Sequence, residues 1–300
     1  MAIAKSVGRG GANRRSDVKF VQIVLNMNLG RLRASPAAFG TAAAVAASAA
    51  AETGPVGHGV AVAAAPTAAP THVPLGEDGV SGPATVRRLE AFQREVGGSA
   101  QPTGRLDPGD ALLGALQANV PAELTSDVLR AMLPNATAAH VARYRQALLD
   151  GMAANEITTP LRQAHFLAQL AHESGDFVHC EEIASGAAYE GRADLGNTQP
   201  GDGMRFKGRG LIQLTGRANY AAYGHARGRD FLTGDNPKRL ATDAATAVDC
   251  ACWYWTSRRL NALADRDDVI AVTKRINGGI NGLADRRERL ARAKYLLRVA

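Results

Sequence analysis

The sequence has 300 residues, of which 46% are hydrophobic and 5% aromatic, and its formal net charge is +7 at pH 7. This length predicts about two domains, and the apolar share is large enough for each domain to bury a core. The positive charge favours a polyanionic partner such as a cell wall, a membrane surface or nucleic acid. Nucleic acid fits least well, because the sequence has no dense Lys/Arg tract interleaved with aromatic residues.

The cysteines Cys180, Cys250 and Cys252 are too few and too irregularly spaced for a disulfide framework. They predict buried free thiols, as in a protein made in a reducing compartment. The N-terminal residues lack the apolar core and cleavage site of a signal peptide. No stretch reaches the ~20 apolar residues that a membrane helix requires. We therefore expect a monomer with no signal peptide and no membrane-spanning segment.

The chain begins with a glycine-rich entry and an amphipathic helix within residues 6–33. Val18, Val21 and Leu25 recur there at helical spacing, and Ser16 is the expected N-cap. Residues 34–73, rich in alanine and proline, predict a flexible surface excursion rather than a domain. The alternative is a helix packed on the domain formed by the flanking residues, because alanine has the highest helix propensity.

Order resumes after the excursion with two further predicted helices. A tight turn at Asp78-Gly79 leads into a helix that carries Leu89 and Phe92. A third helix is expected after Asp107-Pro108 and presents Leu112. The pattern thus predicts three helices before a short joint at residues 119–124.

Several polar and small residues recur in a fixed order through this region. They are Asp17, Val18, Val21 and Gln22, then Asp78, Gly79, Gly82 and Thr85, and finally Phe92 and Gln93. This order resembles the small three-helix peptidoglycan-binding domain. The resemblance implies that residues 1–120 form a wall-binding domain. The alternative is a generic helical adaptor.

From Leu124 onward, successive helices are predicted and strand-like alternation is nearly absent. The helices are expected at about 126–133, 137–154, 159–173, 217–226, 242–256, 265–275 and 285–299. Residues 121–300 therefore predict a second domain, and the whole chain is expected to be mainly α.

The run between His165 and Gly224 carries the densest polar chemistry. His172-Glu173-Ser174-Gly175 places a carboxyl group at the end of an apolar helix, just before a helix-breaking glycine. The segment from Phe206 to Tyr220 then places amides, a hydroxyl and a phenol between spaced glycines. An acid that faces an amide-rich groove suits cleavage of an amide-bearing polysaccharide, because glycosidic cleavage needs a proton donor together with a base or a nucleophile.

These residues resemble glycoside hydrolase family 19, which comprises chitinases and related lysozyme-like endolysins. The segments 187–192 and 194–203 between the two parts look like the endolysin branch. The resemblance implies a lysozyme-like α-helical catalytic domain that works by inversion and without a cofactor. It also implies that Glu173 is the general acid.

The partner of Glu173 lies nine residues further on in related endolysins, which is Glu182 here. On one straight helix, nine residues span ~13 Å, too far for an inverting pair separated by roughly 6.5–9.5 Å. The chain must therefore bend at Gly175-Asp176. Glu181 and Glu190 remain alternatives for the second carboxylate.

The resemblance assigns further roles in the groove. Thr215 would position the attacking water, and the substrate-binding residues would be Gln213, Asn219, Tyr220, Asn277 and Arg286. Arg286 would orient the base carboxylate, unless it is an exposed arginine in a salt bridge. The alternative role for the amides is helix capping or hydrogen bonding within loops.

Other chemistries fit the sequence less well. His172-Glu173 lacks the second histidine of a His-Glu-x-x-His zinc motif, so no metal is expected. Cys180 has apolar neighbours and no adjoining cation that would activate it as a nucleophile.

The sequence therefore predicts a lysozyme-type hydrolase that cleaves β-1,4 glycosidic bonds of bacterial peptidoglycan. The alternatives are a chitinase acting on GlcNAc polymers and a non-catalytic wall-binding protein. The plan resembles a phage endolysin that is made in the host cytoplasm and reaches the periplasmic wall after membrane permeabilisation. A secreted bacterial effector would show the same features.

Overall fold

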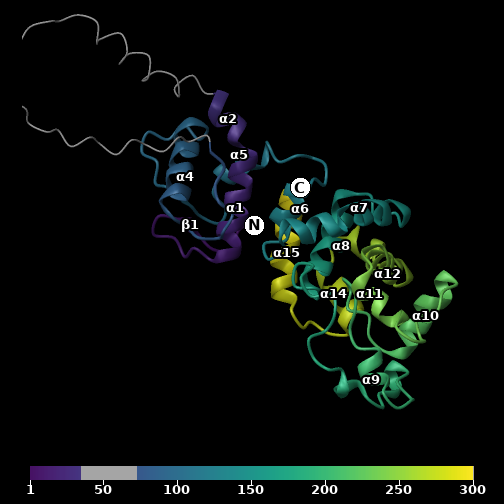
Figure 1. The fold of residues 1–300 in the computed structure, drawn as a ribbon. Helices are drawn as coiled ribbons and strands as arrows, with labels where there is room; N and C mark the ends of the chain where they lie inside the picture. Colours follow the sequence, from purple (N-terminus) through teal and green to yellow (C-terminus); the bar gives the residue numbers. More distant parts are fainter. Residues whose placement is uncertain (35–72, 300) are drawn as a thin grey trace, which may run out of the picture. The chain divides into compact units, whose positions relative to one another are not determined.

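The structure of the protein is a computed structural model that describes residues 1–34 and 73–299 (Figure 1). The chain forms two compact units, Lys5–Asn119 and Val120–Ala300, and Met1–Ala4 belongs to the second. The described residues are mainly α-helical, which confirms the expected fold class. The excursion predicted at 34–73 lies, apart from its two end residues, outside the described residues.

In its described residues, the N-terminal unit is built from helices and one short strand pair. Its elements are β1 (Val7–Gly8), α1 (Arg15–Met27), α2 (Leu29–Ala34), α4 (Pro83–Glu95), β2 (Arg105–Leu106) and α5 (Leu112–Gln117). β1 pairs antiparallel with β2, with Val7 opposite Leu106. Val21, Phe92 and Leu116 are buried, as their helical spacing predicts.

Gln22 of α1 ties this helix to the turn that precedes α4. The Gln22 side chain donates to Asp78 Oδ1 (2.9 Å) and to Thr85 Oγ1 (3.2 Å), and accepts from the Gly79 N–H (2.9 Å). Gly79 has φ 74°, and a Cβ there would lie 2.5 Å from the Arg15 side chain, so only glycine fits this turn. The residues of the sequence pattern therefore meet in space.

The first helix does not begin where the sequence suggests. α1 starts at Arg15 with Arg14 in the N-cap position, and no side chain caps it. Ser16 lies inside the helix, and its hydroxyl accepts a hydrogen bond from Arg14 Nε at 3.0 Å. The prediction of Ser16 as N-cap is therefore wrong.

The C-terminal unit is a helical assembly. Its longer helices are α6 (Ser126–Met132), α7 (Ala138–Ala154), α8 (Pro160–Glu173), α10 (Arg217–Arg227), α12 (Ala244–Ser257), α14 (Val269–Asn277) and α15 (Leu283–Leu296). Its short helical segments are η2 (Ala187–Tyr189), η3 (Ala193–Leu195), α9 (Asp202–Arg205), η4 (Asn236–Lys238), α11 (Arg239–Thr242) and α13 (Asn261–Ala264). Each longer helix lies where the apolar spacing predicts one. None of the described helices is both long and apolar enough to span a bilayer.

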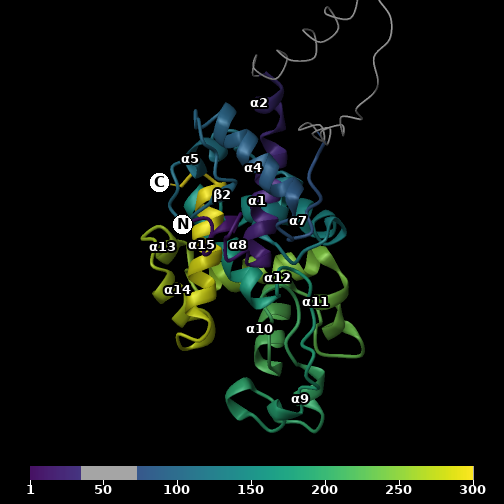
Figure 2. The ribbon, with the colours of Figure 1, turned by 90° about the vertical axis from the view of Figure 1, so that its left-hand side faces the viewer.

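The core of this unit lies between two packed helix pairs. α8 runs alongside α15, and α7 packs against α12 (Figures 1 and 2). Phe166 of α8 meets Trp255 of α12 edge to face, with ring centroids 5.3 Å apart. The α9 region lies at one end of the unit in both views, where it contacts η2.

The first residues of the chain pack with the C-terminal unit. Ile3 has no exposed surface, and the Ala2 carbonyl accepts a hydrogen bond from Arg292 Nε at 3.4 Å. We expect Ile3→Ala to lower the free energy of unfolding by about 2–4 kcal/mol, because it removes a fully buried side chain. Denaturant unfolding measures this change. Ile183→Ala is the control, since Ile183 is 84% exposed, and equal losses would contradict the packing of Ile3.

Candidate active site

Glu173 is the last residue of α8, as the sequence predicts. Thr159 caps the start of this helix by accepting from the Arg162 N–H (3.2 Å), and Pro160 occupies the first turn. Leu170 and its apolar neighbours are buried, which fixes the helix in the core. The Glu173 side chain is 19% exposed, so its carboxyl group lies at the edge of the core.

The chain turns sharply after α8, at the position where the sequence requires a bend. Gly175, Asp176 and Phe177 have φ values of 56°, 65° and 67°. Left-handed backbone is unfavourable for residues other than glycine, so tertiary contacts must hold the two others. Asp176 is buried, accepts from the Asn135 N–H (3.0 Å) and pairs with Arg289. Phe177 is buried edge-on against Tyr144, with ring centroids 5.7 Å apart.

Consecutive residues of α15 hold consecutive residues of α8. Arg286 is buried and donates to Glu173 Oε1 at 2.5 Å and to Gln169 Oε1. Asp285 accepts from His172 Nδ1 at 2.6 Å and from Arg289 Nε at 2.5 Å. Arg286 therefore orients Glu173, the proposed acid, and the expectation that it orients the Glu182 carboxylate or is an exposed arginine is wrong.

The Asp285 contacts shift its ionisation. Burial would raise the pKa of Asp285, but the hydrogen bonds from His172 and Arg289 outweigh burial and lower the pKa from 3.8 to about 2. The folded-state pKa is thus below the unfolded one. The stabilisation from ionised Asp285 is present above about pH 4 and is lost as the pH falls towards about 2.

The lowered pKa of Asp285 gives a testable prediction for Asp285→Asn. The variant should unfold more easily than the wild type at neutral pH, and the difference in free energy of unfolding should shrink below about pH 4. Denaturant unfolding at stepped pH values measures it. Asp127→Asn, at a surface ion pair with Arg130, should differ little from the wild type. A difference for Asp285→Asn that persists undiminished to about pH 2 would contradict the assignment.

Glu182 lies on the segment that returns after the bend. Its Oε1 accepts from the Tyr189 hydroxyl (2.9 Å), and its Oε2 accepts from the Gly208 N–H (3.0 Å). Its own N–H donates to the Gly208 carbonyl at 2.9 Å. Burial and this contact raise the pKa of Tyr189, so the phenol stays a donor. The carboxylate is therefore fixed by two donors.

Three of the predicted site residues converge at Gly208. A Cβ on Gly208 would lie 2.8 Å from Gln213 Oε1, 3.3 Å from Glu182 Oε2 and 3.3 Å from Thr215 Oγ1. The structure thus brings a carboxylate, an amide oxygen and a hydroxyl to one small space beside the backbone. Any side chain at position 208 would enter that space.

Gly208→Ala should therefore impair activity more than folding. The added methyl group displaces the Gln213 side chain and fills the space between Glu182 and Thr215. We expect hydrolysis to fall by at least about tenfold, because small displacements of reacting groups are costly. Gly114→Ala in the N-terminal unit is a control, because Gly114 is helical and a Cβ there meets no atom within 4 Å. Equal activity of Gly208→Ala and the wild type would contradict a role for this space.

The remaining groove candidates differ in position. Gln213 donates its amide hydrogens to the His179 and Gly210 carbonyls (3.1 and 2.9 Å), and Asn219 donates to the Thr215 carbonyl (2.7 Å). These amides shape the loop, and the Gln213 oxygen still faces Gly208.

Tyr220, unlike Asn277, does not lie as expected for a residue that contacts substrate. Tyr220 has no exposed surface, its hydroxyl donates to the Lys207 carbonyl (2.9 Å), and burial raises its pKa. This hydrogen bond to Lys207 holds the segment that carries Gly208. Asn277 is exposed, but its amide donates to the Asn281 carbonyl (3.0 Å) and its oxygen accepts from the Gly279 N–H (2.8 Å). We therefore assign Tyr220 a structural role, whereas the contact of Asn277 with substrate stays a prediction.

The two alternative carboxylates, those of Glu181 and Glu190, bind other groups of the protein. Glu181 pairs with Arg209 at 3.0 Å and with Lys207 at 3.4 Å. Glu190 accepts from the Gly201 and Gly203 N–H groups at 2.7 and 2.8 Å, which fixes the start of α9. Glu182 is the one of the three whose carboxylate meets Thr215 at Gly208.

The three cysteines are free thiols, as the sequence predicts. Cys180, Cys250 and Cys252 are free, and burial raises the pKa of the Cys180 thiol, which contacts the Tyr144 hydroxyl at 2.8 Å. Within residues 1–34 and 73–299, no three His, Cys, Asp or Glu side chains are grouped to hold a metal ion.

The sequence analysis missed several residues that build this site. Asp176 and Arg289 hold the turn that follows Glu173, Tyr189 holds Glu182, and Gly208 leaves room beside Glu182 and Thr215. The Gly-Arg-Gly run at 208–210 was the available signal for Gly208. The others depend on contacts between distant segments, which the sequence does not reveal.

The chain is similar in sequence to known proteins. Residues 151–277 match the family model "Chitinase class I" of glycoside hydrolase family 19, a range that contains Glu173, Glu182 and Thr215 but not Arg286. A Haemophilus influenzae protein named for a glycosyl hydrolase family 19 domain is 35% identical over 157 residues, which span 42% of this chain and 75% of that protein. An Arabidopsis thaliana endochitinase is 37% identical over 139 residues, or 45% of this chain and 47% of that protein. The chain thus spans less than half of this plant relative.

Two solved chitinase structures are also similar to the chain. Chitinase C from Streptomyces griseus shares 25% sequence identity with the chain over 58% of this chain and 92% of that structure, with a TM-score of 0.49. A class IV family 19 chitinase from Zea mays shares 24% identity over 59% of this chain and 94% of that structure, with a TM-score of 0.48.

Proposed function

The chain belongs to glycoside hydrolase family 19, and from this premise we propose that it hydrolyses β-1,4 glycosidic bonds in the glycan of bacterial peptidoglycan by an inverting acid–base mechanism. The reaction needs no cofactor in this scheme. The N-terminal unit, in the same proposal, binds the wall.

In the proposed mechanism each carboxyl group has one task. Glu173 gives its proton to the leaving glycosidic oxygen, while Glu182 takes a proton from the water that attacks the opposite face of the sugar. The Thr215 hydroxyl donates to the Gln213 carbonyl (3.0 Å), so it accepts a hydrogen bond from this water and aligns it. Arg286 holds Glu173 in place, and Tyr189 together with the Gly208 N–H holds Glu182.

One observation carries the proposal above the others. The position that a Cβ on Gly208 would take lies 3.3 Å from both Glu182 Oε2 and Thr215 Oγ1, so the carboxylate and the hydroxyl lie beside the same bare stretch of backbone. In the proposal, the attacking water lies between these two groups and donates a hydrogen bond to each. A base and a hydroxyl around the attacking water are the arrangement that a hydrolase with water as nucleophile requires.

Peptidoglycan is proposed as the substrate on the basis of the N-terminal unit and the charge. The Gln22 contacts with Asp78 and Gly79 join residues whose order resembles a peptidoglycan-binding domain. The net charge of +7 favours an anionic polymer such as the wall over neutral chitin. Chitin is the second candidate, because the Arabidopsis relative is named an endochitinase.

We also propose a phage-type endolysin as the setting. The support is the sequence from Ala187 to Gly203, which resembles the endolysin branch, and the free cysteines, which suit a reducing compartment. In this setting the protein is made in the host cytoplasm and reaches the periplasmic wall after the membrane is permeabilised.

The test compares the two polymers directly. Purified Gram-negative sacculi and colloidal chitin are each incubated with the wild type and with Glu173→Gln, and released sugar reducing ends are measured. We expect the wild type to release more reducing ends from sacculi than from chitin. Glu173→Gln should release none from sacculi. Release from chitin alone would replace the wall by chitin as the substrate, and release from neither would overturn the hydrolase proposal.

A further inference from the structure

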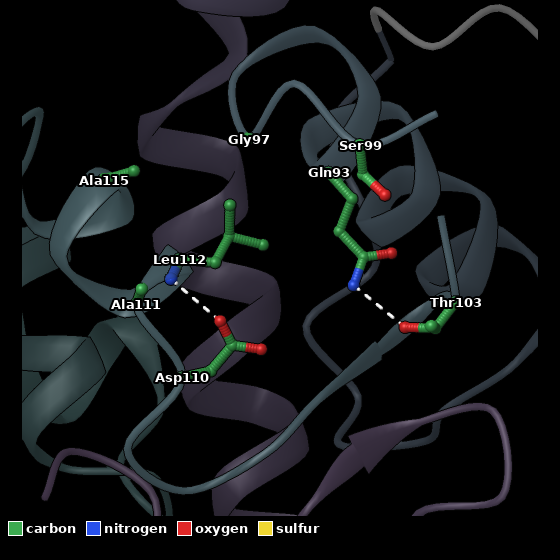
Figure 3. A pocket seen from close by; sticks show the side chains of 8 residues that line it. All are labelled: Gln93, Gly97, Ser99, Thr103, Asp110, Ala111, Leu112 and Ala115. Atoms are coloured by element: carbon green, nitrogen blue, oxygen red, sulfur yellow. Dashed lines mark hydrogen bonds between the residues drawn. The ribbon is translucent and has the colours of Figure 1, made fainter. Parts of the chain in front are cut away.

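The N-terminal unit contains a cavity of about 310 Å³ that the catalytic proposal does not use. It is lined by Gln93, Gly97, Ser99, Thr103, Asp110, Ala111, Leu112 and Ala115 (Figure 3). This volume lies at the lower end of the range of small-ligand pockets, about 300–1,000 Å³. It suits one or two amino-acid residues rather than a polymer.

The walls of the cavity are held by hydrogen bonds within the unit. Gln93 is buried and donates to Thr103 Oγ1 (3.0 Å) and to the Arg105 carbonyl (2.8 Å). Its oxygen accepts from the Gly104 N–H at 2.8 Å. The Gln93 amide is thus used to fix the wall formed by the 97–105 loop, and the cavity is formed before any ligand arrives.

Asp110 supplies the charge of the cavity. One of its carboxylate oxygens accepts from the Leu112 N–H at 2.8 Å, and Figure 3 shows the other oxygen on the side that faces Thr103. Asp110 is the one ionisable side chain in the lining, so the cavity favours a cation and disfavours an anion. A hydrogen bond between a carboxylate and an ammonium group is among the strong ones.

The rest of the lining is small and apolar. Leu112 projects into the cavity between the Ala115 side and the Gln93 side, and Ser99 adds a hydroxyl group (Figure 3). The lining holds no aromatic ring on which the face of a sugar would stack. These surfaces suit methyl-sized side chains better than a glycan.

We propose that this cavity binds a peptide segment that carries a primary ammonium group and small apolar side chains. The ammonium group pairs with Asp110, and methyl groups lie against Leu112 and Ala115. The stem peptides of the bacterial wall, with their alanines and a diamino acid, have this chemistry. Their choice as the source rests on the proposed function, and it makes the N-terminal unit a reader of wall peptide rather than of glycan.

The test uses the full chain with Glu173→Gln, so that binding is measured without cleavage. Calorimetric titration compares N-acetyl-L-Ala-γ-D-Glu-meso-diaminopimelate, whose single ammonium group is on the diamino acid, the same peptide with this amine also acetylated, and a GlcNAc tetramer. Asp110→Asn keeps an acceptor for the Leu112 N–H but removes the charge, and Ala115→Phe fills the cavity. Asp107→Asn, three residues away and outside the lining, is the matched control.

We expect the free-amine peptide to bind and acetylation or Asp110→Asn to weaken binding by at least about tenfold. Ala115→Phe should also weaken it, whereas Asp107→Asn should not. No binding of the free peptide, equal binding after acetylation, or full binding by Asp110→Asn would overturn the proposal. If the GlcNAc tetramer binds and Asp110→Asn abolishes this binding, the cavity is a glycan site and the peptide proposal is overturned as well. Melting temperatures check that each variant is folded. If Ala115→Phe does not fold, the result with Asp110→Asn alone decides the test.

A second assay separates this inference from the proposed function. The wild type and Asp110→Asn, both with Glu173 intact, are given glycan strands from which the peptides have been removed. Equal cleavage of these strands, with weaker retention of Asp110→Asn on intact sacculi, is the expected result. Equal retention would overturn the peptide site alone, whereas no cleavage of any glycan by the wild type would overturn the hydrolase proposal and leave the titration result standing.

Discussion

Glu173→Gln is expected to abolish glycan hydrolysis while the protein stays folded. Gln offers Arg286 an oxygen at the same place, so the contact at the end of α8 is kept, but it has no acidic proton to give to the leaving oxygen. General acid catalysis contributes roughly 10²–10⁴-fold, and activity should fall by that factor. Release of reducing ends from sacculi measures the rate, and the melting temperature checks the fold.

Glu123→Gln is the control for this substitution, because Glu123 is an exposed glutamate in the same unit. It should leave the rate unchanged. Residual activity of Glu173→Gln above about a tenth of the wild type would show that Glu173 is not the acid.

Glu182→Gln should be comparably severe. Gln keeps an oxygen for Tyr189 or the Gly208 N–H, but it does not take a proton from water. Glu190→Gln should reduce the rate only a few-fold at most, since Glu190 holds backbone N–H groups at the start of α9. The same reducing-end assay ranks the three variants. Loss with Glu190→Gln and not with Glu182→Gln would move the base to Glu190.

Much of the fold follows from local pattern in the sequence. Apolar residues at helical spacing locate α7, α8 and α12, because each buries one face in a core. The short helices α9, α11 and α13 have four residues each, too few for a period to show. The placement of Ile3 with the C-terminal unit depends on a contact with sequence-distant residues, which no local pattern encodes.

The site is predictable only in part for the same reason. Glu173 at a helix end and the turn at Gly175 are local features, and both are found. The partner of Arg286 is 113 positions away, so its pairing with Glu173 instead of Glu182 required the structure. Tyr220 was expected in the groove, but the spacing in α10 does not tell which face of the helix is buried, and the structure buries it.

Mass spectrometry of digested sacculi tests the central claim most directly. The account predicts soluble muropeptides whose new ends are sugar reducing ends, either MurNAc or GlcNAc, with every peptide still attached to its lactyl group. The same digest with Glu173→Gln should contain none of them. Products with freed peptides and uncut glycan, or sugar reducing ends that Glu173→Gln still releases, would contradict a glycosidase that uses Glu173 as its acid.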